Sequence, residues 1–212
     1  MVQNFVIPHS RPTLDESDLL SVSKVIRSGR IVQGEVVEKF EKKVAKYIGV
    51  DGAVAMNTGT SALHLSLLAI GIKEGDYVAM PSFVCTALLN AVRYVGAHPT
   101  LVDIDPETYN IDIRDLKKRV KRSTKAIILP HLFGLPADID EIISLGIPII
   151  EDCAQAIGAV YKGRKAGSFG KLSCFSFYAT KVLSTGEGGM VVSDSKSLLK
   201  KIRDFRDYDN KK

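Results

Sequence analysis

The segment Asn57-Thr58-Gly59-Thr60-Ser61 could bind a phosphate group. It follows a short apolar run and opens a helical pattern. Free backbone N–H groups at the start of a helix attract anions, glycine lets an anion approach closely, and the hydroxyls of Thr60 and Ser61 could donate as well. The same residue types are common as ordinary helix caps. Taken alone, the segment favours that simpler interpretation.

Two acids, Glu151 and Asp152, directly follow the apolar run Pro148–Ile150. Open α/β sheets bind ligands at the carboxyl ends of their strands. A carboxylate at this place could therefore pair with a cationic atom of a ligand. Capping of a helix or a surface ion pair would explain the two acids equally well.

A single lysine, Lys181, follows the largely apolar segment Phe175–Thr180. A lysine in apolar surroundings can lose its proton more readily and attack a carbonyl carbon. For a lone lysine the commoner explanation is a surface position with the amine in water. None of the three segments identifies a function by itself.

The elements that must position these residues alternate between short apolar runs and helical stretches. The runs lack polar alternation, which is typical of strands buried on both faces of a parallel sheet. They are Ala53–Met56, Tyr77–Met80, Thr100–Ile104, Ala126–Leu129 and Pro148–Ile150, and helical stretches begin near Thr60, Val84, Asp112 and Asp138. The pattern predicts an α/β fold with a mostly parallel sheet covered by helices on both faces.

Residues 1–50 are predicted to form a helical segment ahead of an α/β core at residues 51–212. Thr13 and Glu16 have the spacing of a capping box, and Gly29 ends the first helix. A second helix is predicted from about Glu35 to Gly49. Two late strands and a closing amphipathic helix are expected at Cys174–Phe177, Met190–Val192 and Leu198–Phe205.

The composition argues against several classes of protein. The net charge is +5, but the basic residues alternate with acids along predicted helices, which indicates solvated faces rather than a nucleic-acid surface. No apolar stretch reaches the length of a membrane span, and the N-terminus does not resemble a signal peptide. Three cysteines, Cys85, Cys153 and Cys174, lack metal-ligand spacing. We expect a cytoplasmic protein that binds neither nucleic acid, membrane nor metal.

Together and in this order, the segments resemble the DegT/DnrJ/EryC1/StrS family of nucleotide-sugar aminotransferases, which depend on pyridoxal 5'-phosphate (PLP). The similarity extends over nearly the whole chain. It also includes Ser28–Gly34, Gly75–Val78, Pro81–Phe83, Gly96–Pro99, Val102–Asp105 and Gly186–Gly189. The resemblance implies the PLP-binding large domain of the fold type I transferases over residues 1–212, without a C-terminal small domain.

The resemblance also implies a role for each site residue. Lys181 would bind the aldehyde carbon of PLP and later carry a proton, while Asp152 would keep the pyridine nitrogen protonated. Gln155 would bind near the phenolic oxygen. The phosphate would lie against Gly59, Thr60, Ser61 and Ser176.

This sequence departs from the family pattern in two ways. Where many relatives stack an aromatic ring on the cofactor, this chain has Cys85, so either Phe83 compensates or Cys85 itself packs against the ring. Relatives also continue for well over a hundred residues past the last residue of this chain. That part carries the small domain and much of the sugar pocket, so we expect little turnover from the 212-residue chain alone.

The implied activity is transfer of an amino group, with glutamate as the expected donor, to a nucleotide-linked keto-sugar in a homodimer. A truncated, non-catalytic or partner-dependent subunit is the main alternative. A PLP sugar dehydratase is less favoured because such relatives have histidine in place of Lys181. A nicotinamide-dependent dehydrogenase is disfavoured because the first turn lacks spaced glycines.

Overall fold

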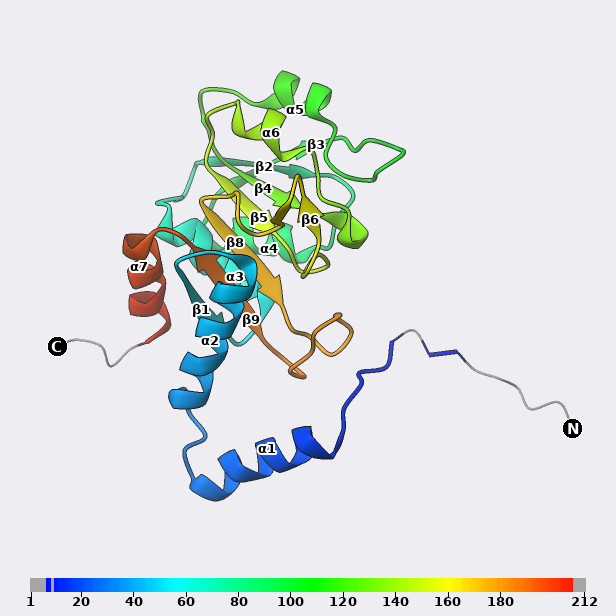
Figure 1. Cartoon of the computed structure of the whole chain (residues 1–212). Coiled ribbons are helices and arrows are strands. Elements are labelled where there is room, and N and C mark those ends of the chain that lie inside the picture. Colours follow the sequence, from blue (N-terminus) through cyan, green and yellow to red (C-terminus); the bar gives the residue numbers. More distant parts are fainter. Residues whose placement is uncertain (1–6, 9, 208–212) are drawn as a thin grey trace, which may run out of the picture.

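The structure is a computed structural model that describes residues 7–8 and 10–207. A sheet of seven strands runs through the centre of the molecule (Figure 1). The strands are Gly52–Met56 (β1), Tyr77–Pro81 (β2), His98–Val102 (β3), Thr124–Pro130 (β4), Ile149–Asp152 (β5), Leu172–Ser176 (β8) and Gly189–Ser193 (β9). They lie side by side in the order β1-β9-β8-β5-β4-β2-β3.

The sheet is mostly parallel. Only β9 runs opposite to its neighbours, since it pairs antiparallel with both β1 and β8, whereas the remaining pairs are parallel. The predicted fold class is therefore confirmed. The carboxyl ends of β1, β4, β5 and β8 point to one edge of the sheet, which is where open α/β sheets bind ligands.

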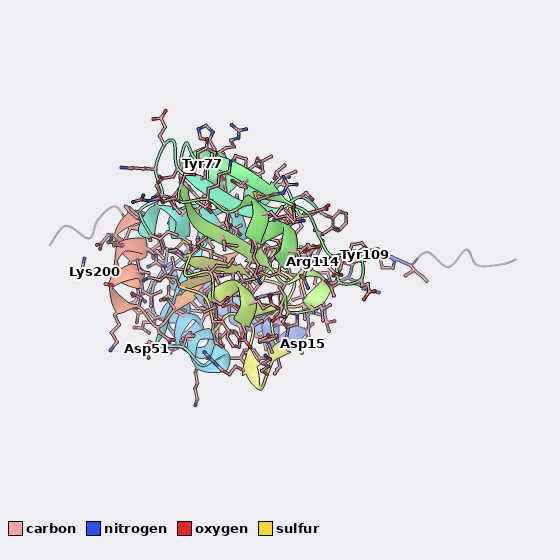
Figure 2. All side chains as sticks on the ribbon, turned by 90° about the horizontal axis from the view of Figure 1, so that it is seen from above. Asp15, Asp51, Tyr77, Tyr109, Arg114 and Lys200 are labelled. Atoms are coloured by element: carbon pink, nitrogen blue, oxygen red, sulfur yellow. The ribbon has the colours of Figure 1, made fainter. Side chains whose placement is uncertain are left out.

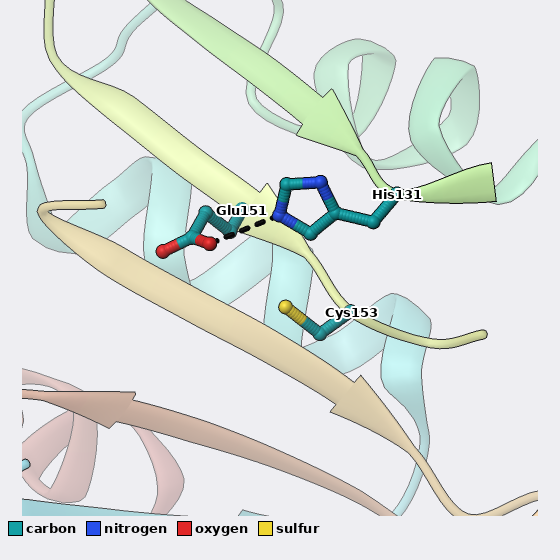
Figure 3. Close-up of side chains that lie close together, drawn as sticks. All are labelled: His131, Glu151 and Cys153. Atoms are coloured by element: carbon teal, nitrogen blue, oxygen red, sulfur yellow. Dashed lines mark hydrogen bonds and ion pairs between the residues drawn. The ribbon is translucent and has the colours of Figure 1, made fainter. Parts of the chain in front are cut away.

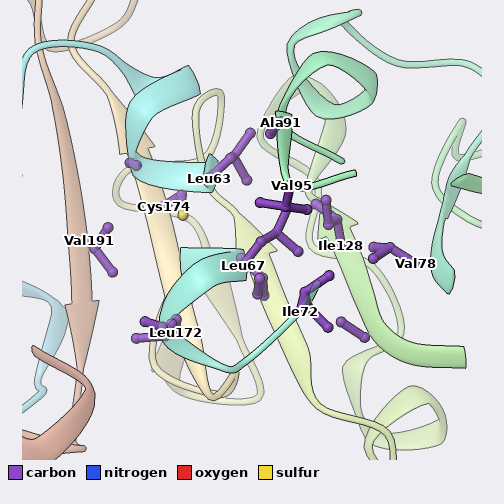
Figure 4. Packing of buried hydrophobic residues seen from close by; sticks show 14 of the residues in the cluster. Leu63, Leu67, Ile72, Val78, Ala91, Val95, Ile128, Leu172, Cys174 and Val191 are labelled. Carbon is purple, nitrogen blue, oxygen red and sulfur yellow. The ribbon is translucent and has the colours of Figure 1, made fainter. Parts of the chain in front are cut away.

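Helices cover both faces of the sheet. The helices are Glu35–Ile48 (α2), Gly59–Ala69 (α3), Ala87–Tyr94 (α4), Ile113–Arg119 (α5), Ile139–Ile143 (α6) and Lys196–Arg206 (α7). On one face α3, α4 and α7 pack on the sheet through the largest apolar cluster, in which Leu67, Ile128 and Val191 are fully buried (Figure 4). On the other face α2 covers β1 and β9, and α5 with α6 covers β2 to β5.

The first helix, Glu16–Ser28 (α1), stands apart from the rest of the molecule (Figure 1). None of its residues is buried. The predicted capping box at Thr13 and Glu16 is wrong. The cap is Asp15, whose carboxylate accepts from the N–H of Ser17, and Asp18 returns a hydrogen bond to the N–H of Asp15. Gly29 ends the helix in the left-handed region, as predicted.

A small hairpin and a short turn were not predicted. Val160–Tyr161 (β6) and Arg164–Lys165 (β7) pair antiparallel across Lys162 and Gly163, which both have positive φ. Two such residues are the signature of the tight hairpin turn that fits the twist of its strands. The turn Leu132–Gly134 (η1) follows β4.

Charged side chains cover the outside of the molecule, as the labelled Asp51, Arg114 and Lys200 illustrate (Figure 2). Within the described residues, no helix is long and apolar enough to cross a membrane.

Candidate active site

A pocket of about 270 Å³ opens where the strand ends and the start of α3 meet. Its wall combines the ends of β4, β5 and β8 with the loops that follow them. Seven of the eight residues predicted for the site line it: Gly59, Thr60, Cys85, Asp152, Gln155, Ser176 and Lys181. Residues more than 120 positions apart in sequence thus meet at one edge of the sheet.

The start of α3 forms one end of this pocket. Thr58 caps the helix, because its hydroxyl accepts from the N–H of Ser61 (3.0 Å). The first N–H groups of a helix have no partner within the helix, which leaves those of Gly59 and Thr60 available to an anion. A Cβ on Gly59 would lie 2.9 Å from the Cβ of Ser176, so only glycine allows this close approach.

Ser176 completes this end of the pocket. Its hydroxyl oxygen accepts a long hydrogen bond from the N–H of Tyr178 (3.4 Å), which leaves its O–H free to donate. Two backbone N–H groups and a hydroxyl therefore converge here, and this is a donor set suited to a phosphate.

Ser61, the eighth predicted residue, lies elsewhere. Its N–H and its hydroxyl both interact with the Thr58 side chain. Ser61 lines a larger, open groove of about 1250 Å³ that separates α1 and the start of α2 from the end of β1. His64 lines the same groove and packs edge-on against Tyr94.

Asp152 is the last residue of β5, and only 9% of its surface is exposed. One carboxylate oxygen accepts from the N–H of Ala154 (3.0 Å). Burial raises the pKa of Asp152, and the Ala154 N–H and the nearby Lys181 ammonium only partly oppose that rise. A carboxylate in this state gains free energy from any cationic ligand atom that reaches it.

Lys181 lies in the loop that joins β8 to β9. The N–H of Lys181 donates to the carbonyl of Tyr178, and Phe177 is bonded at both its N–H and its carbonyl, to Gly188 and Thr185. These bonds fix the two ends of the loop. The Lys181 side chain is partly buried and faces the same pocket as Asp152.

The orientation of the Gln155 amide follows from its hydrogen bond. Its Oε1 accepts from the N–H of Phe133 (2.8 Å). The amide nitrogen is therefore the free end, and it can only donate. Gln155 thus offers the pocket an N–H donor.

Cys85 lies in the segment between β2 and α4 and is exposed to the pocket. Phe83, two residues earlier, does not line the pocket and packs instead against Tyr109, with 5.7 Å between ring centroids. Of the two possibilities for the stacking position, this arrangement favours Cys85.

Glu151 does not line the pocket, and its carboxylate lies beside the His131 ring (Figure 3). It is fully buried and accepts five hydrogen bonds, which come from His131, Gly167, Phe169, Gly170 and Ser173. Burial alone would raise the pKa of Glu151, but the bonds from His131 and the backbone N–H groups prevail and lower it. Glu151 is a charged anchor for the turn that precedes β8.

His131 is a structural histidine that also borders the pocket. Its Nδ1 accepts from the N–H of Ala137 (3.1 Å), so the proton is on Nε2, which donates to Glu151 (2.9 Å). Cys153 lies beside this pair, and burial raises the pKa of its thiol well above the ordinary value. His131 and Glu151 are thus hydrogen-bonded to each other, and burial keeps the neighbouring Cys153 thiol protonated, which makes the three side chains unsuited to a metal.

Comparison with known proteins identifies the family. The sequence model of the DegT/DnrJ/EryC1/StrS aminotransferase family matches residues 12–212. The chain belongs to this family. It is 41% identical to the GDP-perosamine synthase of Escherichia coli O157:H7 over 205 residues, which cover 94% of this chain and 56% of the relative.

Two further relatives extend the comparison. The UDP-N-acetyl-3-dehydro-alpha-D-glucosamine 3-aminotransferase of Acidithiobacillus ferrooxidans is 41% identical over 98% of this chain and 59% of its own length. A Streptococcus pneumoniae protein solved in a PLP form superimposes with a TM-score of 0.90 at 29% identity, over 94% of this chain and 57% of that one. The chain thus spans little more than half the length of these relatives.

Sequence reasoning missed the residues that orient the family site from outside the pocket. Phe133, whose N–H donates to the Gln155 side chain, is such a residue. The bonds that Phe133 and Gln155 share depend on tertiary packing, so the sequence carries no short-range signal for them.

Proposed function

We propose that this chain binds PLP in the pocket between α3 and the ends of β5 and β8, and that it is the cofactor domain of a nucleotide-sugar aminotransferase. The observation that carries the proposal is the convergence of complementary groups in one pocket: a phosphate seat at Gly59, a buried carboxylate at Asp152 and a lysine amine at Lys181. These groups match the phosphate, the pyridine nitrogen and the aldehyde of PLP. The PLP form of the S. pneumoniae relative agrees with this cofactor.

Bound PLP would supply an electron-withdrawing ring that makes a proton next to an amine easier to remove. The protein residues would hold the cofactor and move that proton. Gly59, Thr60 and Ser176 would bind the phosphate. Asp152 would hold a proton on the ring nitrogen, and the Lys181 amine would bind the aldehyde carbon and then carry the proton between substrate and cofactor.

The donor, the acceptor and the assembly are part of the same proposal. We propose a nucleotide-linked keto-sugar as the acceptor, because two relatives are named for GDP- and UDP-linked sugars. Glutamate is proposed as the amino donor on the family resemblance alone. A homodimer is proposed because α1 leaves apolar side chains exposed. A cytoplasmic location fits the three free thiols.

The direct test is to titrate the purified chain with PLP and follow visible absorbance. We expect a saturable band that inorganic phosphate weakens by competing for the seat at Gly59. Glutamate should then remove the band as the cofactor takes up its amino group, whereas a Lys181→Ala control should form no such band. Absence of a saturable band at millimolar PLP would contradict the proposal.

A further inference from the structure

The amide of Gln155 is held by the turn Leu132–Gly134, which borders the pocket through Leu132. Its Oε1 accepts from the N–H of Phe133, which leaves the amide nitrogen as the available donor of a residue that lines the pocket. The donor that Gln155 presents therefore depends on where the turn Leu132–Gly134 holds one backbone N–H group.

The backbone of this turn is unusual. Phe133 has φ 55° and ψ 22°, and Gly134 has φ 82°, so two consecutive residues are left-handed. A residue other than glycine in this region costs roughly 1 kcal/mol or more. The Phe133 ring is 70% exposed, so burial of the ring does not offset that cost.

Asn110 holds the turn at both ends. It comes from the loop between β3 and α5 and is 4% exposed. Its Oδ1 accepts from the N–H of Leu132 (3.1 Å), and its Nδ2 donates to the carbonyl of Leu135 (3.0 Å). Only a side chain with both a donor and an acceptor can make these two bonds. They form a continuous chain from Asn110, through the turn, to Gln155.

We infer that Asn110 is a positioning residue, which fixes the Phe133 turn so that the Gln155 amide donates into the cofactor pocket. This inference rests on the proposed function, since the oxygen that would receive the bond belongs to PLP. None of the atoms of Asn110 needs to touch the cofactor, because it acts through two backbone segments and one amide.

The expected consequence is spectroscopic. A hydrogen-bond donor stabilises the negative charge of the phenolic oxygen of PLP. The oxygen then attracts the proton on the neighbouring Lys181 nitrogen less strongly. When the donor is lost or misplaced, that proton is held more tightly and leaves at higher pH. The pH midpoint of the visible absorbance change therefore reports the Gln155 bond separately from folding.

The experiment measures this midpoint in the PLP-loaded chain and in variants. Gln155→Leu should raise it by about one pH unit, the scale of one hydrogen bond to a charged oxygen. Asn110→Ala should raise it by roughly half as much, and Asn110→Asp, which keeps the acceptor and loses the donor, should raise it less. Asn90→Ala, an exposed position on α4, is the matched control and should leave the midpoint unchanged.

A double variant separates positioning from a general loss of structure. Because Asn110 acts through Gln155, Asn110→Ala should add no further shift in the Gln155→Leu background. An unchanged midpoint in Asn110→Ala, or equal shifts in both backgrounds, overturns the inference while PLP binding stands. Failure of the wild-type chain to form the visible band overturns the proposed function and this inference with it.

Discussion

At the scale of single residues, the two neighbouring acids on β5 have opposite electrostatic roles. Burial raises the pKa of Asp152, which faces the pocket. At Glu151, which faces the interior, burial is outweighed by His131 and by backbone N–H groups, and the pKa is lowered. Adjacent residues of a strand point to opposite faces, so one Glu-Asp pair supplies both a site for a cationic ligand atom and a structural anchor.

The raised pKa of Asp152 predicts that this residue lowers stability when no cation is bound. Folding favours the protonated form, so charged Asp152 opposes folding at neutral pH and ceases to do so as pH falls through its raised pKa. Asp152→Asn should keep or raise the melting temperature of the PLP-free chain at pH 7, yet weaken PLP binding at least tenfold by loss of a charge-assisted bond. A lower melting temperature together with unchanged PLP affinity would refute this role. If the PLP-loaded chain reacts with glutamate, Asp152→Asn should lower the rate of that reaction by orders of magnitude.

Cys85 should be the one reactive thiol of the three. Cys153 and Cys174 are buried and burial raises the pKa of each thiol, whereas Cys85 is exposed to the pocket. We expect an alkylating reagent to label Cys85 rapidly in the folded chain, and PLP to slow that labelling about tenfold at a concentration ten times its Kd. Mass spectrometry of the labelled peptides measures both effects. Labelling at equal rates with and without PLP would place Cys85 away from the cofactor.

At the scale of elements, the turn before β8 depends on the charge of Glu151. Glu151→Gln leaves buried donors facing an amide nitrogen, which should lower the free energy of unfolding by about 3 kcal/mol. Because the folded pKa is lowered, this stabilisation is present above the ordinary pKa of 4.5 and is lost as pH falls through the folded value. Denaturant titration of the wild type and of Glu151→Gln at neutral and at acid pH measures this contribution to the free energy of unfolding. Glu141→Gln, at an exposed ion pair with Lys117, is the control and should change stability by less than about 0.5 kcal/mol.

The elements themselves could largely be predicted, because buried strands and their helices carry strong local patterns. The error at β3 is informative: the sequence pattern placed it at Thr100–Ile104, but it spans His98–Val102. The observed strand includes Pro99, which is tolerated because β3 lies at the edge of the sheet. The meeting of Lys181 and Asp152 in one pocket could be predicted, because the carboxyl ends of neighbouring parallel strands lie at one edge of the sheet.

The hydrogen bonds of Asn110 and Glu151 could not be predicted from the sequence. Their partners are 16 to 25 residues away, and tertiary packing decides which residues they are.

At the scale of the whole molecule, α1 is the feature that most suggests association. Leu19, Val22 and Ile26 share a face, and each is more than half exposed. An unpartnered apolar face of this kind favours contact with another surface.

We therefore expect the chain to self-associate, and sedimentation velocity measures this directly. Leu19→Glu combined with Ile26→Glu should shift the chain toward monomer while changing the free energy of unfolding by less than about 0.5 kcal/mol, since α1 buries nothing. Ser21→Glu combined with Ser28→Glu places the same charges at the same spacing on another face and should leave association unchanged. A wild-type chain that is monomeric at micromolar concentration would contradict the expectation.

The central claim is that Lys181 binds the aldehyde carbon of PLP beside Asp152. Borohydride reduction of the PLP-treated chain makes that bond permanent, and peptide mapping then locates the label. We predict one label per chain, on the peptide that contains Lys181, with little label in Lys181→Ala. A label found mainly on Lys171 or Lys162, or label that is unaffected by Lys181→Ala, would contradict the account.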